Sequence, residues 1–345
     1  MKYIRTYETE EKFLADKDST SRGFRLKPTL YKHSDVGNGI YLELDDPRKH
    51  GDSTYMEITL DSDAEFSFYI GNKSGDSQTT MNCSIDWGDG TVETKTITAD
   101  DKGFKLAHNY VAGSYKIELY GVERGYSIPG DTTNYISYIS PLHSSVKRIV
   151  LGNNVTDIGE SAFNECESLI SVYIPESVTS IGNLAFIGCI SLTSVHIPES
   201  VTTIGEYAFG SCKSLTSVHI PNSVISIGAS AFDKCESLTS VYIPEGVTSI
   251  GNWTFEFCTS LTSISIPERV TTIGEKAFKG CSALASISSF NTTAPTLSTT
   301  DSDNDSESVF HNLPTNGTLH IKPGATGYDA WLSSLPSGWT IVEDL

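Results

Sequence analysis

The chain has 345 residues, with 43 Asp or Glu against 24 Lys or Arg, and its formal net charge is -19. An acidic excess of this size argues against nucleic acid or an anionic membrane as the main partner, because both require clustered Lys and Arg. No apolar run reaches the roughly 18 residues of a membrane span, and Met1–Leu14 lacks the apolar core of a secretory signal. We therefore expect no nucleic-acid binding, no membrane insertion and no signal-directed export.

Residues 1–52 are balanced in charge, with 10 basic and 10 acidic residues. Two interpretations remain open, a partly ordered arm with solvated charges and a docking segment that attaches the protein to a larger assembly. The docking hypothesis rests on basic and aromatic side chains that lie close together in the sequence. These candidate docking residues are Arg22, Phe24, Arg25, Lys27 and Tyr31.

Residues 53–121 predict a β-sandwich. Apolar and polar residues alternate in short runs such as 55–60 and 65–70, which is typical of strands with one buried face. The Asp89-Gly90 pair is a strong hairpin signal. The motif Trp87-Gly-Asp-Gly90, followed by His108-Asn-Tyr110, resembles a PKD domain, an immunoglobulin-like module. This resemblance implies a structural turn at Asp89-Gly90, a core position for Tyr110 and a role as a spacer or contact module.

Residues 122–145 are predicted to be a linker, and a repeat with a period of 23 residues follows over 146–290. Phe, Leu, Ile-Gly and Ile-Pro recur at this step, together with six of the seven cysteines. The cysteines in the repeat are Cys166, Cys189, Cys212, Cys235, Cys258 and Cys281. A fixed period of this length indicates a solenoid in which neighbouring turns stack at about 5 Å and like residues form ladders.

One repeat shows how each turn is built. Val195 and Ile197 alternate with polar residues, which predicts a short strand that Pro198 ends. A second extended piece leads to Gly205, which we expect to permit a bend. Residues 206–212 place Ala, Phe and Cys at helical or 3₁₀ spacing against the core.

The consensus LxxVxIPxxVxxIGxxAFxxC resembles the BspA-like leucine-rich repeats of bacterial surface antigens. The resemblance implies a mainly β solenoid of the adhesion type. Residues 291–345 are predicted to hold an insert loop, one last repeat and a C-terminal cap. Val309-Phe310 would match Ala277-Phe278 across the insert, and residues 327–331 and 339–342 would supply a closing helix and strand.

The six periodic cysteines are predicted to be small buried hydrophobes, because they occupy a ladder position. Disulfides would need an oxidising compartment, and a zinc site would need closely paired ligands, whereas no CxxC motif occurs.

The outward positions of the strands form a candidate ligand-binding face. Its central ladder is Tyr173, His196, His219, Tyr242 and Ser265, and an acidic ladder with Glu176, Glu199 and Glu245 lies across the Pro. Exposed Tyr and His beside hydroxyls and acids suit contact with protein or carbohydrate. The alternative is a solvated face whose residues merely favour strands.

Metal and cofactor signals are weak. His196 and His219 lack a fixed third ligand. The insert alternates acids at Asp301, Asp303, Asp305 and Glu307, as calcium loops do, but it has no Gly at the sharp turn. We predict no metal and no cofactor.

The chain carries no enzyme motif such as GxSxG or HExxH, so we predict a non-enzymatic binding or adhesion protein. The architecture favours a component of a bacteriophage virion, such as a tail or capsid fibre, which binds a host-surface protein or glycan through the repeats and other virion proteins through the arm. The alternatives are a bacterial cell-surface adhesin and an intracellular scaffold. Self-association into a homo-oligomer stays open.

Overall fold

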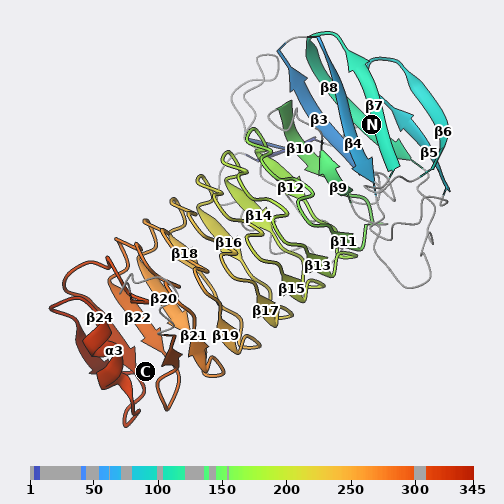
Figure 1. Cartoon of the computed structure of the whole chain (residues 1–345). Coiled ribbons are helices and arrows are strands. Elements are labelled where there is room, and N and C mark those ends of the chain that lie inside the picture. Colours follow the sequence, from blue (N-terminus) through green and yellow to red (C-terminus); the bar gives the residue numbers. More distant parts are fainter. Residues whose placement is uncertain are drawn as a thin grey trace. The chain divides into compact units, whose positions relative to one another are not determined.

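The computed structural model describes residues 4–7, 40–43, 54–61, 63–70, 80–98, 104–120, 136–139, 145–153, 155–298 and 308–345. The chain divides into two compact units, Met1–Asp52 and Ser53–Leu345. In the first unit, β1 (Ile4–Tyr7) pairs with β2 (Ile40–Glu43) in antiparallel register. The second unit holds a sandwich and a solenoid (Figure 1), which agrees with the mainly β fold predicted from the sequence.

The sandwich consists of two facing groups of strands. One is formed by β3 (Thr54–Leu60), β8 (Gly113–Tyr120), β5 (Thr80–Asp86) and β6 (Val92–Thr98). The other is formed by β7 (Phe104–Tyr110), β4 (Ala64–Ile70) and β9 (Ile136–Ile139). Strand β9 comes from the segment that was predicted to be a linker and pairs with β4.

The predicted turn at Asp89 closes the hairpin between β5 and β6, where the Trp87 amide donates to the Thr91 carbonyl at 3.0 Å. His108 Nε2 lies 2.8 Å from Asp89 Oδ2, and this hydrogen bond lowers the pKa of Asp89 to about 2. The buried Tyr110 hydroxyl donates to the Trp87 carbonyl at 2.9 Å. These contacts hold the turn in place and give its side chains a structural role.

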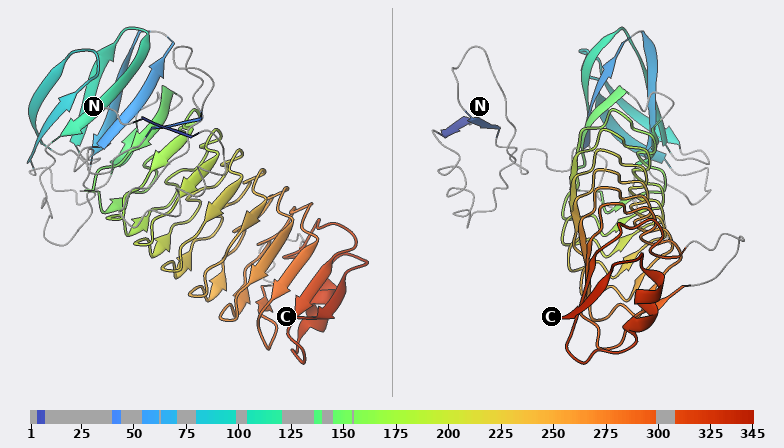
Figure 2. Two further views of the ribbon diagram at one scale, coloured as in Figure 1. Left: turned by 180° about the vertical axis from the view of Figure 1, so that it is seen from behind. Right: turned by 90° about the vertical axis from the view of Figure 1, so that its left-hand side faces the viewer.

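Short parallel strands line each of the two long sides of the solenoid, and its turns lie in a row (Figure 2). The first side carries the predicted strand of each repeat. Its strands are β10 (Val146–Val150), β12 (Ser171–Tyr173), β14 (Ser194–His196), β16 (Ser217–His219), β18 (Ser240–Val241), β20 (Ser263–Ile266), β22 (Ser286–Ser289), β24 (Thr318–Ile321) and β25 (Thr340–Glu343).

The second side carries two-residue strands, which precede the Gly of each repeat or, in the last of them, Ser298. They are β11 (Asp157–Ile158), β13 (Ser180–Ile181), β15 (Thr203–Ile204), β17 (Ser226–Ile227), β19 (Ser249–Ile250), β21 (Thr272–Ile273) and β23 (Thr296–Leu297). Their register advances by 23 residues from β11 to β21, as the sequence predicts.

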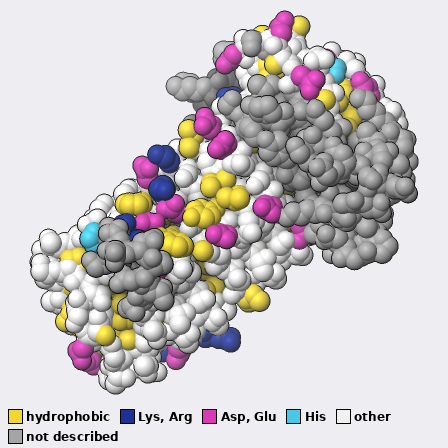
Figure 3. Space-filling view, viewed as in Figure 1, with side chains coloured by type: hydrophobic (Ala, Val, Ile, Leu, Met, Phe, Trp, Pro, Cys, Tyr) yellow, Lys and Arg dark blue, Asp and Glu magenta, His cyan; other side chains and the backbone are white. Residues whose placement is uncertain are grey.

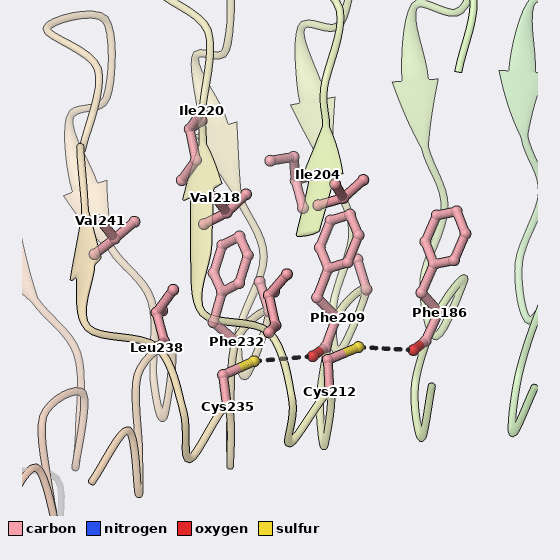
Figure 4. Close-up of a cluster of buried hydrophobic side chains, with 14 of the residues drawn as sticks. Phe186, Ile204, Phe209, Cys212, Val218, Ile220, Phe232, Cys235, Leu238 and Val241 are labelled. Atoms are coloured by element: carbon pink, nitrogen blue, oxygen red, sulfur yellow. Dashed lines mark hydrogen bonds between the residues drawn. The ribbon is translucent and has the colours of Figure 1, made fainter. Parts of the chain in front are cut away.

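Stacked phenylalanines form the core of the solenoid. The rings of Phe163, Phe186, Phe209, Phe232, Phe255, Phe278 and Phe310 are fully buried, and neighbouring centroids lie 5.1 to 6.1 Å apart. Figure 4 shows this row beside the strand residues Val218 and Val241. Phe310 stacks on Phe278 across the insert, which confirms the predicted alignment of Val309-Phe310 with Ala277-Phe278.

The chain between the second strand and the Cys differs from the expected helical or 3₁₀ segment. It is a run of turns in which two residues of each repeat from 161 to 280 have positive φ, between 52° and 73°, for example Tyr207 and Ser211. Their amides, with that of Phe209, donate to the next repeat at 2.7 to 3.0 Å. A helix would direct these amides along its own axis, whereas the turns add three hydrogen bonds between neighbouring repeats.

The Gly after each Ile is explained by close approach rather than by a bend. The φ of Gly205 lies outside the left-handed region, and a Cβ added there would lie 2.5 Å from the Asn183 nitrogen and 2.6 Å from the Gly182 carbonyl carbon. Stacking at this distance leaves no room for a side chain.

Both ends of the solenoid are covered. At the C-terminal end, helix α3 (Tyr328–Ser334) places Trp331 against Phe310, with ring centroids 5.4 Å apart, and β25 pairs with β24 as the predicted closing strand. At the N-terminal end, β10 pairs with β12 of the array and with β3 of the sandwich. The first repeat therefore continues directly into a sandwich sheet.

Candidate functional site

The predicted ligand-binding face lies on the first side of the solenoid, where strand residues alternate between the core and solvent. Val195 and Ile197 are buried, and His196 between them is exposed. His196 is in register with His219, and the His219 ring lies parallel to that of Tyr242, with centroids 6.3 Å apart and an interplanar angle of 10°. Tyr173 occupies the same strand position one repeat earlier and is half-buried. We call Tyr173, His196, His219 and Tyr242 the aromatic stripe.

The acidic residues that follow the Pro of each repeat lie next to this stripe. Glu176, Glu199, Glu245 and Glu268 are all exposed, and Asn222 takes the place of a Glu in the middle repeat. The Tyr242 hydroxyl donates to Asn222 Oδ1 at 3.2 Å, which shows that the two ladders are in contact. We call these five residues the acidic column.

The ladder of the aromatic stripe extends beyond Ser265, where the sequence prediction ended. Ser265 is in register with Ser288, which pairs with His320, and His320 pairs with Val342 of β25. His320 Nδ1 also lies 2.9 Å from Asp344 Oδ1. The sequence carried a signal for His320, because Leu319-His-Ile321 repeats the pattern Val195-His-Ile197.

Two groups of predicted site residues lie outside the described residues. They are the docking residues Arg22, Phe24, Arg25, Lys27 and Tyr31, and the acids of the insert, Asp301, Asp303, Asp305 and Glu307. Both predictions stay untested by the structure.

Among the residues that the structure describes, no group of three or more His, Cys, Asp or Glu side chains is arranged to hold a metal ion. Within the same residues, no helix has the length and apolar character needed to cross a membrane.

The six periodic cysteines are buried free thiols. From Cys189 onward, each Sγ lies 3.1 to 3.3 Å from the carbonyl oxygen of the Phe one repeat earlier. Figure 4 shows two of these contacts, from Cys212 to Phe186 and from Cys235 to Phe209. Each of these five cysteines is therefore a hydrogen-bond donor as well as the predicted small apolar residue. Burial raises the pKa of Cys166 and of Cys281 to about 12, which disfavours the reactive thiolate.

A cluster of charges that the sequence analysis missed lies on the turn side of the array. Asp233 is buried, with Lys234 Nζ 3.3 Å from its Oδ2, while its Oδ1 and the Ser230 hydroxyl have no hydrogen-bond partner. In the next repeat, Glu256 pairs with Lys279 at 3.5 Å. Burial raises the pKa of both Asp233 and Glu256. Asp233 occupies a position that is Asn, Ile or Gly in the three preceding repeats, so the repeat pattern gave no warning of a buried acid.

On the face shown in Figure 3, most of the described atoms are neither charged nor hydrophobic, and the charged side chains are mainly acidic. Such a surface suits polar contacts with a partner rather than a permanent apolar interface.

Comparison with solved structures gives leucine-rich-repeat proteins. A leucine-rich-repeat protein of T. pallidum is 38% identical over 41% of this chain and 66% of its own, just under two thirds, with a TM-score of 0.40. One from Bacteroides ovatus is 22% identical over 77% of this chain and 76% of its own, with a TM-score of 0.44. A leucine-rich cell surface protein of Faecalibacterium prausnitzii is 25% identical over 59% of this chain and 64% of its own, with a TM-score of 0.31.

No curated protein matches the chain. The model of one protein family matches residues 134–224 and 179–300, with six copies of its repeat. The matched residues comprise most of the solenoid, with its Phe, Cys and Ile-Gly ladders. The match does not reach the sandwich strands β3 to β8, so the PKD resemblance stays a prediction. Residues 134–300 of this chain are therefore similar to the BspA type leucine-rich repeat region that this model describes.

Proposed function

We propose that the protein is a non-enzymatic binding protein whose repeat array contacts a protein or glycan on a cell surface through the aromatic stripe. The repeat family supports a binding or adhesion role. The observation that carries the proposal is the register of the stripe. It brings exposed rings from consecutive repeats onto one face, and the buried Phe row beneath fixes their spacing.

The chemistry of the stripe suits binding rather than catalysis. Tyr and His combine a flat ring with a polar group, and such side chains are enriched where proteins contact ligands. The backbone around the stripe is rigid because parallel register holds its strands, so little conformational entropy is lost when a partner binds.

The test replaces Tyr173, His196, His219 and Tyr242 with Ser, in parallel with a matched control on the opposite sheet. The control replaces the exposed residues Thr203, Ser226, Ser249 and Thr272 with Ala. Labelled full-length protein is then measured by flow cytometry on animal epithelial cells and on bacterial cells, before and after protease or glycosidase treatment. We expect the stripe variant to lose binding while the control keeps it. Equal binding by both variants, with unchanged circular dichroism, would overturn the proposal.

The finer assignment to a bacteriophage fibre rests on the order of arm, sandwich and repeat array and on the lack of a secretory signal in Met1–Leu14. The family match supports binding by the array and lends no support to a virion. Binding to bacterial cells, together with loss of particle incorporation on deletion of residues 1–52, would favour the virion. Binding to epithelial cells, together with recovery of the protein in the bacterial envelope, would favour the adhesin.

A further inference from the structure

The charges of the array are divided between its two sides. On the turn side, each basic residue has an acidic neighbour within 4 Å. The pairs are Lys213–Glu236 at 3.1 Å, Lys234–Asp233 at 3.3 Å, Lys279–Glu256 at 3.5 Å and Lys276–Glu275 at 3.9 Å. These four lysines therefore already have acidic partners on the turn side and do not pair with the acidic column.

On the strand side, the acidic column has an ion pair at its C-terminal end. Lys322, which follows β24, places Nζ 3.3 Å from Glu268 Oε1. Exposed Arg269 also lies at this end. Farther along the column, Glu199 and Glu245 form no ion pair within the described part of the chain. The Lys322 contact shows how an amine fits against the column, and Glu199 and Glu245 offer the same kind of carboxylate without an ion-pair partner among the described residues.

The aromatic stripe supplies the second half of a cation-binding surface. The hydrogen bond from Tyr242 to Asn222 joins stripe and column, so one ligand can contact both. The parallel rings of His219 and Tyr242 offer faces and edges for the aliphatic stems of long basic side chains. A Tyr face near a carboxylate is a favourable place for a guanidinium group.

We propose that the strand side of the array binds an extended cationic polypeptide segment, which lies across the strands along the stripe and the column. This inference rests on the proposed function and names its partner class. Glu199 and Glu245 are two repeats apart, or roughly 10 Å at the spacing of neighbouring strands. In a polyproline II segment, residues three apart lie on one face and are separated by about 9 Å. A segment in this extended conformation with Lys or Arg at every third residue therefore matches the Glu199–Glu245 pair.

The test uses the full chain and short synthetic peptides that carry Arg, Lys or Glu at every third position, separated by Gly and Ser. The key variant is Glu199→Gln with Glu245→Gln. Its matched control is Glu167→Gln with Glu206→Gln, which removes two exposed charges away from the column. We expect the Arg and Lys peptides to bind in a salt-dependent way and the Glu peptide not to bind. The column variant should weaken binding at least fivefold, while the control should change it by less than twofold.

The outcomes separate this inference from the proposed function. If the column variant and the control weaken peptide binding equally, the attraction is diffuse and the inference is wrong. If the stripe variant loses cell binding while the column variant keeps it, or if neutral oligosaccharides bind independently of the column, the cationic partner is wrong and the proposed function stands. If neither variant changes binding to cells, both proposals fall.

Discussion

A close backbone contact between neighbouring repeats makes Gly205→Ala an informative perturbation. The added Cβ would lie 2.5 Å from the Asn183 nitrogen, whereas ordinary contacts begin near 3.4 Å, so the two repeats must separate locally by close to an ångström. That movement would stretch the bond from the Gly205 amide to the Ile181 carbonyl, now 2.8 Å, and the bond from the Glu206 amide to Asn183 Oδ1, also 2.8 Å.

The expected cost follows from these contacts. Overpacking of this kind costs about 1–3 kcal/mol, and weakening one hydrogen bond adds about 1 kcal/mol. The reduced freedom of Ala in the unfolded chain returns about 0.4–1 kcal/mol, because the φ of Gly205 is accessible to Ala. We therefore expect a net loss of about 2 kcal/mol.

Gly251 provides the matched control, because it occupies the same position two repeats later and its surroundings are less crowded. A Cβ there would lie 3.2 Å from Thr254 Oγ1 and 3.3 Å from Ala229. We expect Gly251→Ala to cost less than about 1 kcal/mol, because contacts at 3.2 to 3.3 Å require the neighbouring atoms to move by only a few tenths of an ångström.

The assay combines urea unfolding, which measures the free energy of global unfolding, with hydrogen exchange. Hydrogen exchange is needed because repeat arrays can open locally, and a global value does not report such local opening. A loss of 2 kcal/mol corresponds to about thirtyfold faster exchange of amides around residue 205. Equal protection in the Gly205→Ala and Gly251→Ala variants would refute the view that close backbone approach explains the Gly ladder.

Three further predictions follow from the repeat geometry. Ser211 has φ +58°, a left-handed conformation that is unfavourable for a residue with a Cβ and accessible to Gly. Ser211→Gly should therefore stabilise the protein by roughly 0.5–1 kcal/mol in thermal unfolding. A loss of stability would contradict this explanation. Asp233→Asn should raise stability at pH 7 by about 1 kcal/mol. Burial raises the pKa of Asp233, so the folded state favours the protonated carboxyl and loses stability as the pH rises and the carboxyl ionises. The stability gained by Asp233→Asn should therefore vanish near pH 3, where the carboxyl is protonated in both states. An equal gain at pH 3 and pH 7 would count against a charge effect. Cys83 is the one cysteine outside the repeat, so it is first replaced by Ser. The native variant should then react with Ellman's reagent only as fast as it unfolds, because burial raises the pKa of the six periodic thiols. A rapid reaction would show that these thiols are accessible in the folded protein.

The sequence predicted the array well because its ladders repeat at one step. The Phe row, the register of the strands, the continuation at Phe310 and the closing helix follow from that period. The turns around Tyr207 were mistaken for helix because the three-residue spacing of Ala208, Phe209 and Cys212 suits both structures. Only the φ values and the direction of the amides distinguish them.

The candidate face was predictable in part. Alternation within one strand places His196 outward, and the period then places His219 and Tyr242 beside it. The contact between Tyr242 and Asn222 depends on how the chain turns after the Pro, which no spacing reveals. The burial of Asp233 was hidden for a similar reason, because it depends on the neighbouring repeats rather than on its own.

The sheet that runs from β3 through β10 to β12 has a mechanical consequence. A pull between the sandwich and β25 acts across the strands, so it would open neighbouring strands one pair at a time instead of shearing many hydrogen bonds together. Each turn that peels away releases 23 residues, or about 75 Å of extended chain. Backbone pairing anchors the first turn, so a tethered molecule would lengthen in steps under load and shorten again when the load is removed.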